Sequence, residues 1–212
     1  MSLRDLLLVL MLALPAPYHE RENADSRRAR LAIVAQAISD ASLQATCADA
    51  KKAADCQKIW PGQQRDLALL LVTEAYWESR LARNVHEGRC REFECDPYRS
   101  SQTGKIEHRA RTLWQMQYTR PIDSEWNHMV GADLRSTRTA AWAAAKLLGS
   151  AYRACGTISG AISRLSGNGR CVWSGADRRT LLFEQLRLQA DRLSGTSRER
   201  ASKRSRGRPP RP

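Results

Sequence analysis

Several features that would indicate common classes of protein are missing from this chain of 212 residues. No apolar stretch approaches the roughly 20 residues that a membrane-spanning helix needs, which excludes a multi-span membrane protein. The six cysteines include no Cys-x-x-Cys pair, which excludes the usual zinc ribbons and thioredoxin-like motifs. No segment alternates apolar and polar residues as a half-buried strand would. The chain does carry an excess of positive charge, +13 in total, which favours polyanionic partners such as nucleic acid, anionic lipid or cell-wall polymer.

The apolar residues recur at helical spacing along most of the chain. Alanine-rich or amphipathic segments predict helices over residues 28–46, 66–82, 137–148, 156–165 and 177–193. Asp25 or Ser26 can cap the first of these helices, and Gly149 is expected near the end of the third. The sequence therefore predicts an all-α fold, with one domain over residues 21–193.

The two ends of the chain differ from this domain. Within residues 1–20, the apolar block 6–14 has the length of a signal-peptide core, with a short buried helix as the alternative. Residues 194–212 hold seven Lys or Arg, one Glu and a single apolar residue. We therefore expect a disordered basic tail that attracts polyanions without specific recognition of nucleic acid. Together with the cysteines, the first segment favours a periplasmic or secreted protein without a transmembrane span.

Two glutamates lie on the apolar face of the second predicted helix. At 100° per residue, Glu74 and Glu78 fall one turn apart in the middle of a stripe of leucines. Burial and mutual repulsion both raise the pKa of a carboxyl group, as a general acid near neutral pH requires. The alternative is a buried ion pair, in which the two carboxylates are neutralised by Arg80, Arg83 or Arg109.

Glu78 also stands first in an ordered series of motifs. Glu78-Ser79 ends a leucine-rich helix, Thr112-Leu113-Trp114-Gln115-Met116-Gln117 follows after a loop, and an alanine-rich helix (139–148) and the segment 161–167 come last. This order resembles the lysozyme-like domain of soluble lytic transglycosylases and goose-type lysozymes. In that family a Glu-Ser pair at a helix end carries the catalytic acid, and a Gly-Leu-Met-Gln motif lines the sugar cleft. The resemblance covers about residues 64–173, and its most specific element is the pairing of Glu78-Ser79 with Met116-Gln117.

The resemblance implies a lysozyme-like helical fold and an enzyme of the lytic transglycosylase or lysozyme type. Such an enzyme cuts the β-1,4 bond between N-acetylmuramic acid and N-acetylglucosamine, and Glu78 would be its single acid and base. No cofactor and no metal are expected, and the partner of a monomeric protein would be the glycan strands of peptidoglycan. The substrate-binding residues would be Ser79, Gln115, Met116, Gln117, Trp114 and Glu74.

One departure from the family's pattern bears on activity. Leu165 stands where the family has the tyrosine that helps to position the acid, and Ser166 stands where it has an asparagine. The alternative function is therefore a catalytically weak or inactive glycan-binding protein. A replacement hydroxyl would have to come from Tyr98, Tyr118 or Tyr152.

The reaction type stays open at this point. In lytic transglycosylases the sugar's own 6-hydroxyl captures the sugar cation and gives a 1,6-anhydro product. A hydrolytic lysozyme instead holds a second carboxylate that activates water. In this chain the second carboxylate would come from the segment that follows Glu78, where the candidates are Glu87, Glu92, Glu94 and Asp96.

Tryptophan is frequent and phenylalanine is rare, with six residues against two. Indole faces stack on the apolar sides of pyranose rings, so tryptophans near the motifs are candidate sugar platforms. Trp77 and Trp114 meet this condition. Core packing is expected for Trp60, Trp126 and Trp142.

The cysteines fall into local pairs, for which we expect the disulfides Cys47–Cys56, Cys90–Cys95 and Cys155–Cys171, although six cysteines allow other connectivities. Loops stapled in this way suit an oxidising compartment. The alternative for the middle pair is a zinc site that includes His86 and His108, but this spacing matches no common zinc pattern.

Overall fold

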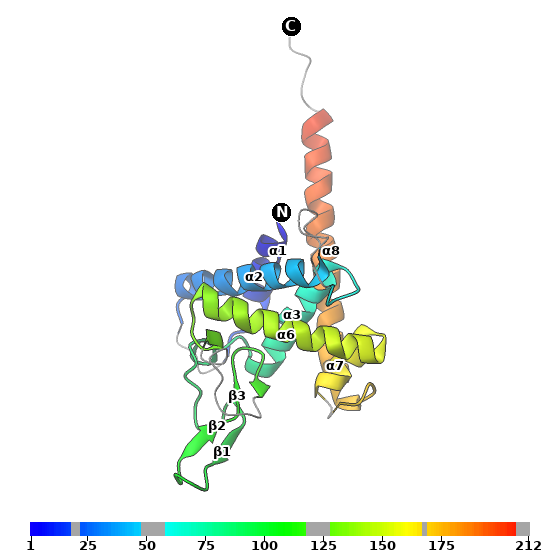
Figure 1. Cartoon of the computed structure of the whole chain (residues 1–212). Coiled ribbons are helices and arrows are strands. Elements are labelled where there is room, and N and C mark those ends of the chain that lie inside the picture. Colours follow the sequence, from blue (N-terminus) through cyan, green and yellow to red (C-terminus); the bar gives the residue numbers. More distant parts are fainter. Residues whose placement is uncertain (18–21, 48–57, 118–127, 167–168, 207–212) are drawn as a thin grey trace.

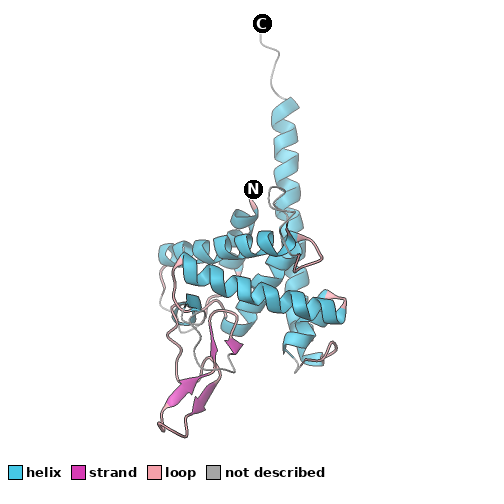
Figure 2. Ribbon diagram, viewed as in Figure 1, coloured by secondary structure: helices cyan, strands magenta, loops and turns pink. Residues whose placement is uncertain are grey.

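The computed structural model describes residues 1–17, 22–47, 58–117, 128–166 and 169–206, with the backbone alone at Gln117 and over 196–206. Helices account for 65% of the structure, which confirms the predicted all-α class (Figure 2). In the part of the chain that is described, no helix combines the length and the apolar character needed to cross a membrane.

The described elements follow one another in this order: α1 (Leu3–Ala13), α2 (Ala24–Thr46), α3 (Gln64–Ser79), α4 (Arg83–His86), β1 (Pro97–Arg99), β2 (Ile106–His108), β3 (Ala110–Arg111), β4 (Met116–Gln117), α6 (Leu134–Cys155), α7 (Ile158–Ser166), the 3-10 helix η2 (Ser174–Ala176) and α8 (Asp177–Arg206).

Helix α3 forms the centre of the fold. Helices α1, α2, α6 and α8 all contact it, and α2 and α6 lie alongside each other across it (Figure 1). Every residue from Leu67 to Tyr76 is buried. A helix that is buried all round belongs in a core, so the single stripe expected for this segment describes only part of what it buries. Glu74 therefore lies inside the core.

The end of α3 turns the chain sharply beside Glu78. The helix ends at Ser79 rather than at the expected Ala82, because Arg80 and Leu81 both adopt the left-handed conformation with φ of 55°. Leu81 nevertheless stays in the core at 1% exposure. The periodic pattern of apolar residues therefore continues past the point where the helix itself has ended.

Gly149 has a packing role and does not end its helix. Helix α6 continues to Cys155 and is capped by Gly156 in the left-handed conformation, with φ of 75°. A Cβ on Gly149 would lie 2.6 Å from Cγ2 of Ile59, so only glycine allows this close approach.

The four short strands are a feature that the sequence pattern did not predict. β1 pairs with β2 and β3 pairs with β4, both in antiparallel register, and they lie together at one end of the molecule (Figure 2). With two or three residues each, these strands are too short for a visible alternation of apolar and polar residues.

The apolar N-terminal segment forms helix α1, which packs into the core. Leu6, Leu7, Leu10 and Met11 are buried, and the helix contacts α2, α3 and α8. The segment 6–14 therefore packs as the alternative interpretation expected, as a short buried helix.

The last helix is longer than expected. Helix α8 runs to Arg206 rather than to Leu193, so the disordered tail expected from Ser194 is helical over 194–206. Arginine, lysine, glutamate and alanine favour helix in this segment, and the first proline comes only at Pro209.

Two of the three expected disulfides are confirmed, namely Cys90–Cys95 and Cys155–Cys171. Cys47 is disulfide-bonded as well, and Cys56, its expected partner, lies outside the described residues. Disulfides of this kind persist in oxidising compartments.

Candidate active site

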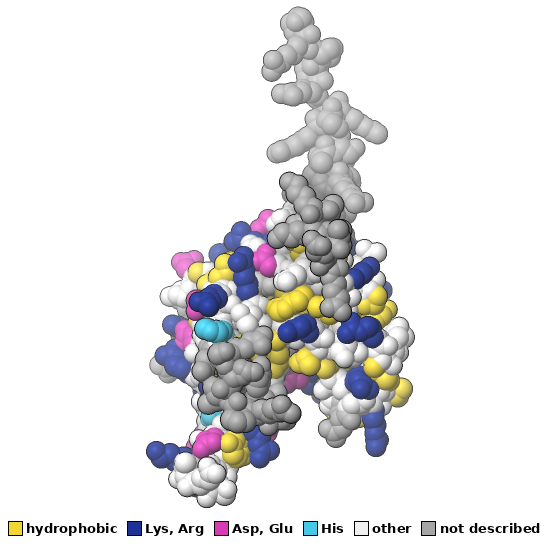
Figure 3. Space-filling view, in the orientation of Figure 1, with side chains coloured by type: hydrophobic (Ala, Val, Ile, Leu, Met, Phe, Trp, Pro, Cys, Tyr) yellow, Lys and Arg dark blue, Asp and Glu magenta, His cyan; other side chains and the backbone are white. Residues whose placement is uncertain are grey.

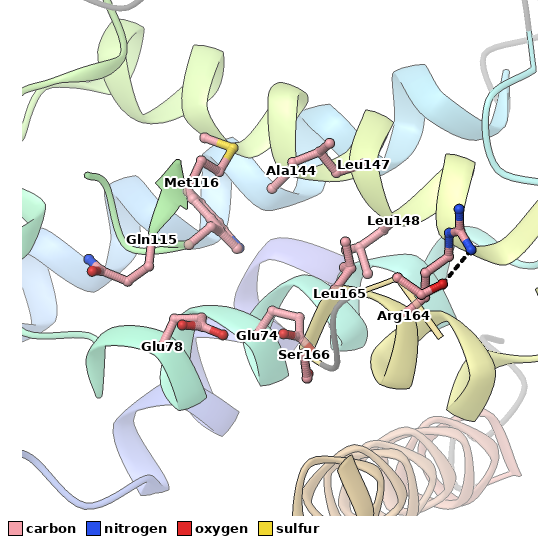
Figure 4. Close-up of a pocket in the computed structure, with 12 residues that line it drawn as sticks. Glu74, Glu78, Gln115, Met116, Ala144, Leu147, Leu148, Arg164, Leu165 and Ser166 are labelled. Atoms are coloured by element: carbon pink, nitrogen blue, oxygen red, sulfur yellow. Dashed lines mark hydrogen bonds between the residues drawn. The ribbon is translucent and has the colours of Figure 1, made fainter. Parts of the chain in front are cut away.

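A cavity of about 420 Å³ opens beside the second half of α3. Glu74 and Glu78 lie along α3 on one side of it, and Met116 faces them from β4 (Figure 4). Leu148 and Leu165 lie at its other end (Figure 4). The remaining lining residues are Trp114, Gln115, Ala144, Leu147, Arg164, Ser166 and Gly169. The structure therefore brings Glu78 and Met116 together, as the order of motifs predicted.

A second cavity of about 280 Å³ lies at the C-terminal end of α3. It shares Glu78 and Gln115 with the first cavity and is otherwise lined by residues that follow Glu78 or belong to the disulfide loop 90–95, together with Pro17. Glu78 thus lines both cavities.

Arg179 of α8 holds both glutamates with a single nitrogen atom. Its Nη1 donates to Oε2 of Glu74 at 2.7 Å and to Oε1 of Glu78 at 2.5 Å. The exposed fraction of the side chain is 6% for Glu74, 10% for Arg179 and 30% for Glu78. Glu78 is therefore the member of this cluster that a ligand in either cavity can reach.

The buried ion pair considered from the sequence does form, but with a different arginine. Arg80 lies over the rings of Tyr76 and Trp77, with its guanidinium carbon 4.9 and 5.4 Å from the two centroids. Arg83 pairs with the carboxylate of Glu87, the residue directly after α4, and Arg109 lies over the ring of a tyrosine on β1. The expectation that one of these three arginines neutralises the glutamates was wrong.

The environment of Glu74 favours its protonated form. Burial raises the pKa of Glu74 to about 7, against the attraction of Arg179, and the negative charge of Glu78 adds to the rise. Oε1 of Glu74 is buried and has no hydrogen-bond partner among the described residues, which makes a full charge there costly. Glu74 therefore keeps its proton up to about neutral pH.

The residues predicted to bind substrate around Glu78 have different surroundings. Met116 is 7% exposed and lines the first cavity, and Gln115 lines both cavities. Nε2 of Gln115 donates to the carbonyl oxygen of Thr112 at 3.0 Å. The hydroxyl of Ser79 donates to the carbonyl oxygen one turn earlier in α3, at 2.7 Å, so its proton is used within the helix. The side chain of Gln117 lies outside what the structure describes.

Neither predicted tryptophan platform offers an open ring face in these cavities. Trp114 lines the first cavity but is only 6% exposed, and its Nε1 donates to the carbonyl oxygen of Leu71 at 2.9 Å. This bond holds the loop before β4 against α3. Trp77 is half-buried and lines neither cavity. Core packing holds fully for Trp60 and partly for Trp142, whereas Trp126 lies outside the described residues.

No tyrosine of the described residues lines either of the two cavities. Tyr98 donates to a glutamate of its own hairpin at 2.6 Å, and Tyr152 packs against Trp60 with ring centroids 4.6 Å apart. Tyr118 lies outside the described residues. Leu165 itself lines the cavity and is 39% exposed.

Of the four candidates for a second carboxylate, Glu94 lines a cavity together with Glu78. Its Oε2 accepts hydrogen bonds from Nδ2 of Asn84 at 2.5 Å and from the backbone N–H of Arg91 at 2.9 Å. The other three candidates line neither cavity. Glu87 is engaged in ion pairs, and Glu92 and Asp96 are exposed.

The zinc alternative is contradicted. Cys90 and Cys95 form a disulfide, so their sulfurs are not available as thiolate ligands. Nε2 of His86 lies 2.8 Å from the hydroxyl of Thr137, and Nδ1 of His108 lies 2.7 Å from a backbone carbonyl oxygen. Within the described ranges, no group of three or more His, Cys, Asp or Glu is placed to hold a metal ion.

Arg179 is the residue of this site that sequence reasoning missed, although a signal was present. It lies four, seven and eleven positions before Phe183, Leu186 and Ala190, which are all buried. These spacings put an arginine on the apolar face of the last helix, just as Glu74 and Glu78 stand on the apolar face of α3.

Comparisons with protein-family models, with curated proteins and with solved structures returned no match.

Proposed function

We propose that this protein cleaves the glycan strands of peptidoglycan at the β-1,4 bond between N-acetylmuramic acid and N-acetylglucosamine, with Glu78 as acid and base. The observation that carries the proposal is the position of Glu78, which is partly exposed and lines two cavities. A sugar polymer that occupies both cavities would have a glycosidic bond near this carboxyl group. The order of motifs around Glu78, which resembles the lysozyme-like domain of lytic transglycosylases, supports the same chemistry.

A carboxyl group that retains a proton up to about pH 7, that of Glu74, lies beside Glu78 and contacts the same guanidinium nitrogen. A general acid has to be protonated close to the pH at which the enzyme works. In this scheme Glu78 delivers the proton to the substrate, because it is the exposed member of the cluster.

Cleavage of the glycosidic bond needs only Glu78 and the substrate's own 6-hydroxyl. Glu78 gives its proton to the bridging oxygen, the bond between C1 and that oxygen breaks, and positive charge develops on the sugar. The oxygen of the sugar's own 6-hydroxyl then bonds to C1, and its proton passes to the Glu78 carboxylate. This step restores the acid and gives a 1,6-anhydro product.

Arg179 has a defined part in the same scheme. After Glu78 has given up its proton, the guanidinium beside it stabilises the carboxylate that remains. The contact also fixes the position of the side chain, because Arg179 is itself held by Glu74. Arg179 is therefore a positioning residue for Glu78.

The charge of the protein suits an anionic wall polymer. The chain carries a net charge of +13, and lysine and arginine side chains are spread over the face shown in Figure 3. A surface of this kind attracts a polyanion and raises its local concentration near the site.

A second candidate function is a catalytically weak or inactive glycan-binding protein. Two observations favour it. Leu165 lines the cavity where the resembling family has a tyrosine, and Arg179 contacts Glu78 directly, so the carboxyl group that would donate the proton is held in an ion pair. The two candidates differ in turnover, and the experiment below measures it.

The test is the release of soluble fragments from purified peptidoglycan by the wild type and by Glu78→Gln. We expect Glu78→Gln to lower the rate at least about 100-fold, since it cannot donate a proton, and to leave the circular dichroism spectrum unchanged. Glu184→Gln is the matched control, because the side chain of this glutamate of α8 is 44% exposed and pairs with Arg187 on its own helix. Equal release by wild type and Glu78→Gln would refute the role of Glu78. Binding of peptidoglycan without any release by the wild type would establish the second candidate.

Mass spectrometry of the products distinguishes the two reaction types. The route through the 6-hydroxyl gives 1,6-anhydro ends, and we expect Glu94→Gln to leave their rate of formation largely unchanged. Reducing ends that disappear in Glu94→Gln would assign hydrolysis to Glu94.

A further inference from the structure

The second cavity has a wall that the proposed chemistry at Glu78 does not use. This wall is the loop closed by the Cys90–Cys95 disulfide, which contributes Phe93, Glu94 and Cys95 to the lining. The opposite side comes from the end of α3 and the residues after it, among them Arg80.

The disulfide loop is held firmly against the body of the protein. Cys90 and Cys95 pack on Ala82 and Val85, and the backbone N–H of Ala110 donates to the carbonyl oxygen of Cys95 at 3.0 Å. Within the loop, Glu94 accepts the hydrogen bonds from Asn84 and Arg91 described above. A loop fixed in this way presents its remaining side chains in defined positions.

Phe93 is the apolar residue that this rigid loop presents to solvent. Its ring is 73% exposed, although it is one of only two phenylalanines in the chain. The other phenylalanine, Phe183, is fully buried in the core. An exposed aromatic ring on the rim of a cavity is suited to stack on the apolar face of a pyranose ring.

Polar groups line the same cavity as Phe93. The guanidinium of Arg80 is held over Tyr76 and Trp77, so its position is restricted and its N–H groups remain donors for sugar hydroxyls. Gln115 reaches the disulfide, with Nε2 3.4 Å from Sγ of Cys95. An apolar ring face with adjacent hydrogen-bonding groups is the combination that carbohydrate requires.

We propose that the second cavity binds the sugar units of the glycan strand that lie beyond the scissile bond, with Phe93 as the stacking platform. This inference rests on the proposed function and deepens it, because it makes the disulfide loop a substrate-binding element. The glycan strand is then bound in the first cavity on one side of Glu78 and in the second cavity on the other. The protein accordingly prefers long strands to fragments that fill the first cavity alone.

The inference is tested by binding in a background that cannot cut. Glu78→Gln and Glu78→Gln/Phe93→Ala are sedimented with insoluble purified peptidoglycan, and Glu78→Gln/Leu188→Ala is the matched control. Leu188 is a 55% exposed apolar residue of α8 that lines neither cavity. We expect Phe93→Ala to weaken binding about fivefold to tenfold, Phe93→Trp to retain it, and Leu188→Ala to have no effect.

Turnover by the single variants supplies the second measurement. With Glu78 intact, Phe93→Ala should raise KM for long strands and leave kcat nearly unchanged, because a contact made equally in the bound and reacting states affects binding alone. Binding and KM equal to those of Leu188→Ala would overturn the inference while cleavage at Glu78 stands. A wild type that cuts nothing but loses binding on Phe93→Ala would refute the proposed function and support the binding site.

Discussion

Replacing Arg179 by methionine measures how far the two glutamates depend on one buried positive charge. The substitution removes the guanidinium and keeps a flexible apolar side chain of moderate length in its place. Removing one partner of a buried ion pair costs about 3–5 kcal/mol, because the other partner keeps its charge without compensation. Glu74, with 6% of its side chain exposed, is not hydrated and avoids the cost of an unpaired charge by taking up a proton, whereas Glu78, at 30%, is partly hydrated. We therefore expect a loss below this range, about 2 kcal/mol, at pH 8.

The cost depends on pH in a direction that the structure fixes. Arg179 is one of the causes that lower the pKa of Glu74, and burial already raises that pKa to about 7. Without Arg179 the pKa of Glu74 rises further, so Glu74 is neutral at pH 5 in both proteins. At that pH no buried charge is left unpaired by the substitution, and we expect a loss of only about 1 kcal/mol.

Urea unfolding at pH 5 and at pH 8 gives the free energy of unfolding of the wild type, Arg179→Met, Glu74→Gln and the double variant. In Glu74→Gln/Arg179→Met both members of the most buried contact are uncharged, so we expect most of the loss at pH 8 to be recovered. A loss that is equal at both pH values and unchanged in the double variant would refute the reasoning. Arg179 would then contribute through packing alone.

Two further predictions concern stability. The pKa of Glu74 is about 7 in the folded protein against an ordinary value of 4.5, so its stabilising contribution is complete below pH 4.5 and is lost as the pH rises through 7. The buried His86 has the opposite sign, because its pKa falls from 6.5 to about 4, and its contribution is present above pH 6.5 and lost as the pH falls through 4. Melting temperatures are measured between pH 4 and 8. We expect Glu74→Gln to lose the fall in stability with rising pH that Glu74 causes, and His86→Gln to lose the fall in stability with decreasing pH that His86 causes. Gly149→Ala should destabilise the fold by about 1–3 kcal/mol in urea unfolding, since the new Cβ would lie 2.6 Å from Ile59, and unchanged stability would contradict this.

Helices α2, α3, α6, α7 and α8 could be predicted from the periodic spacing of their apolar residues, but their ends could not. The pattern that predicted α3 includes Leu81, whose side chain is buried after the helix has ended. Gly149 has the composition signal of a helix end, yet it serves a close contact with Ile59. In both cases tertiary packing overrides a local signal.

The loop between α4 and β4 was the least predictable part of the fold. Its strands pair in two short hairpins, and the disulfide Cys90–Cys95 fixes the segment before them. Cysteine spacing alone predicted that disulfide correctly. No local sequence pattern predicts that Phe93 lines a cavity together with Glu78. The position of Phe93 depends on how the disulfide loop packs on the end of α3.

For the candidate site, periodicity placed Glu74 and Glu78 on a buried face, and the same argument required a positive partner for them. The predicted partners were arginines near the glutamates in the sequence or in the following loop, namely Arg80, Arg83 and Arg109. The chain offers 35 lysines and arginines, and most of them can remain in solvent at little cost. An arginine on the apolar face of a helix is buried and cannot remain in solvent. Like the two glutamates, Arg179 therefore needs a partner of opposite charge. Two buried faces that carry opposite charges satisfy each other when their helices pack together, and α3 and α8 do so. The charged residues on the apolar faces of the predicted helices therefore include Arg179 as well as the two glutamates, so the sequence itself contains the signal for this ion pair.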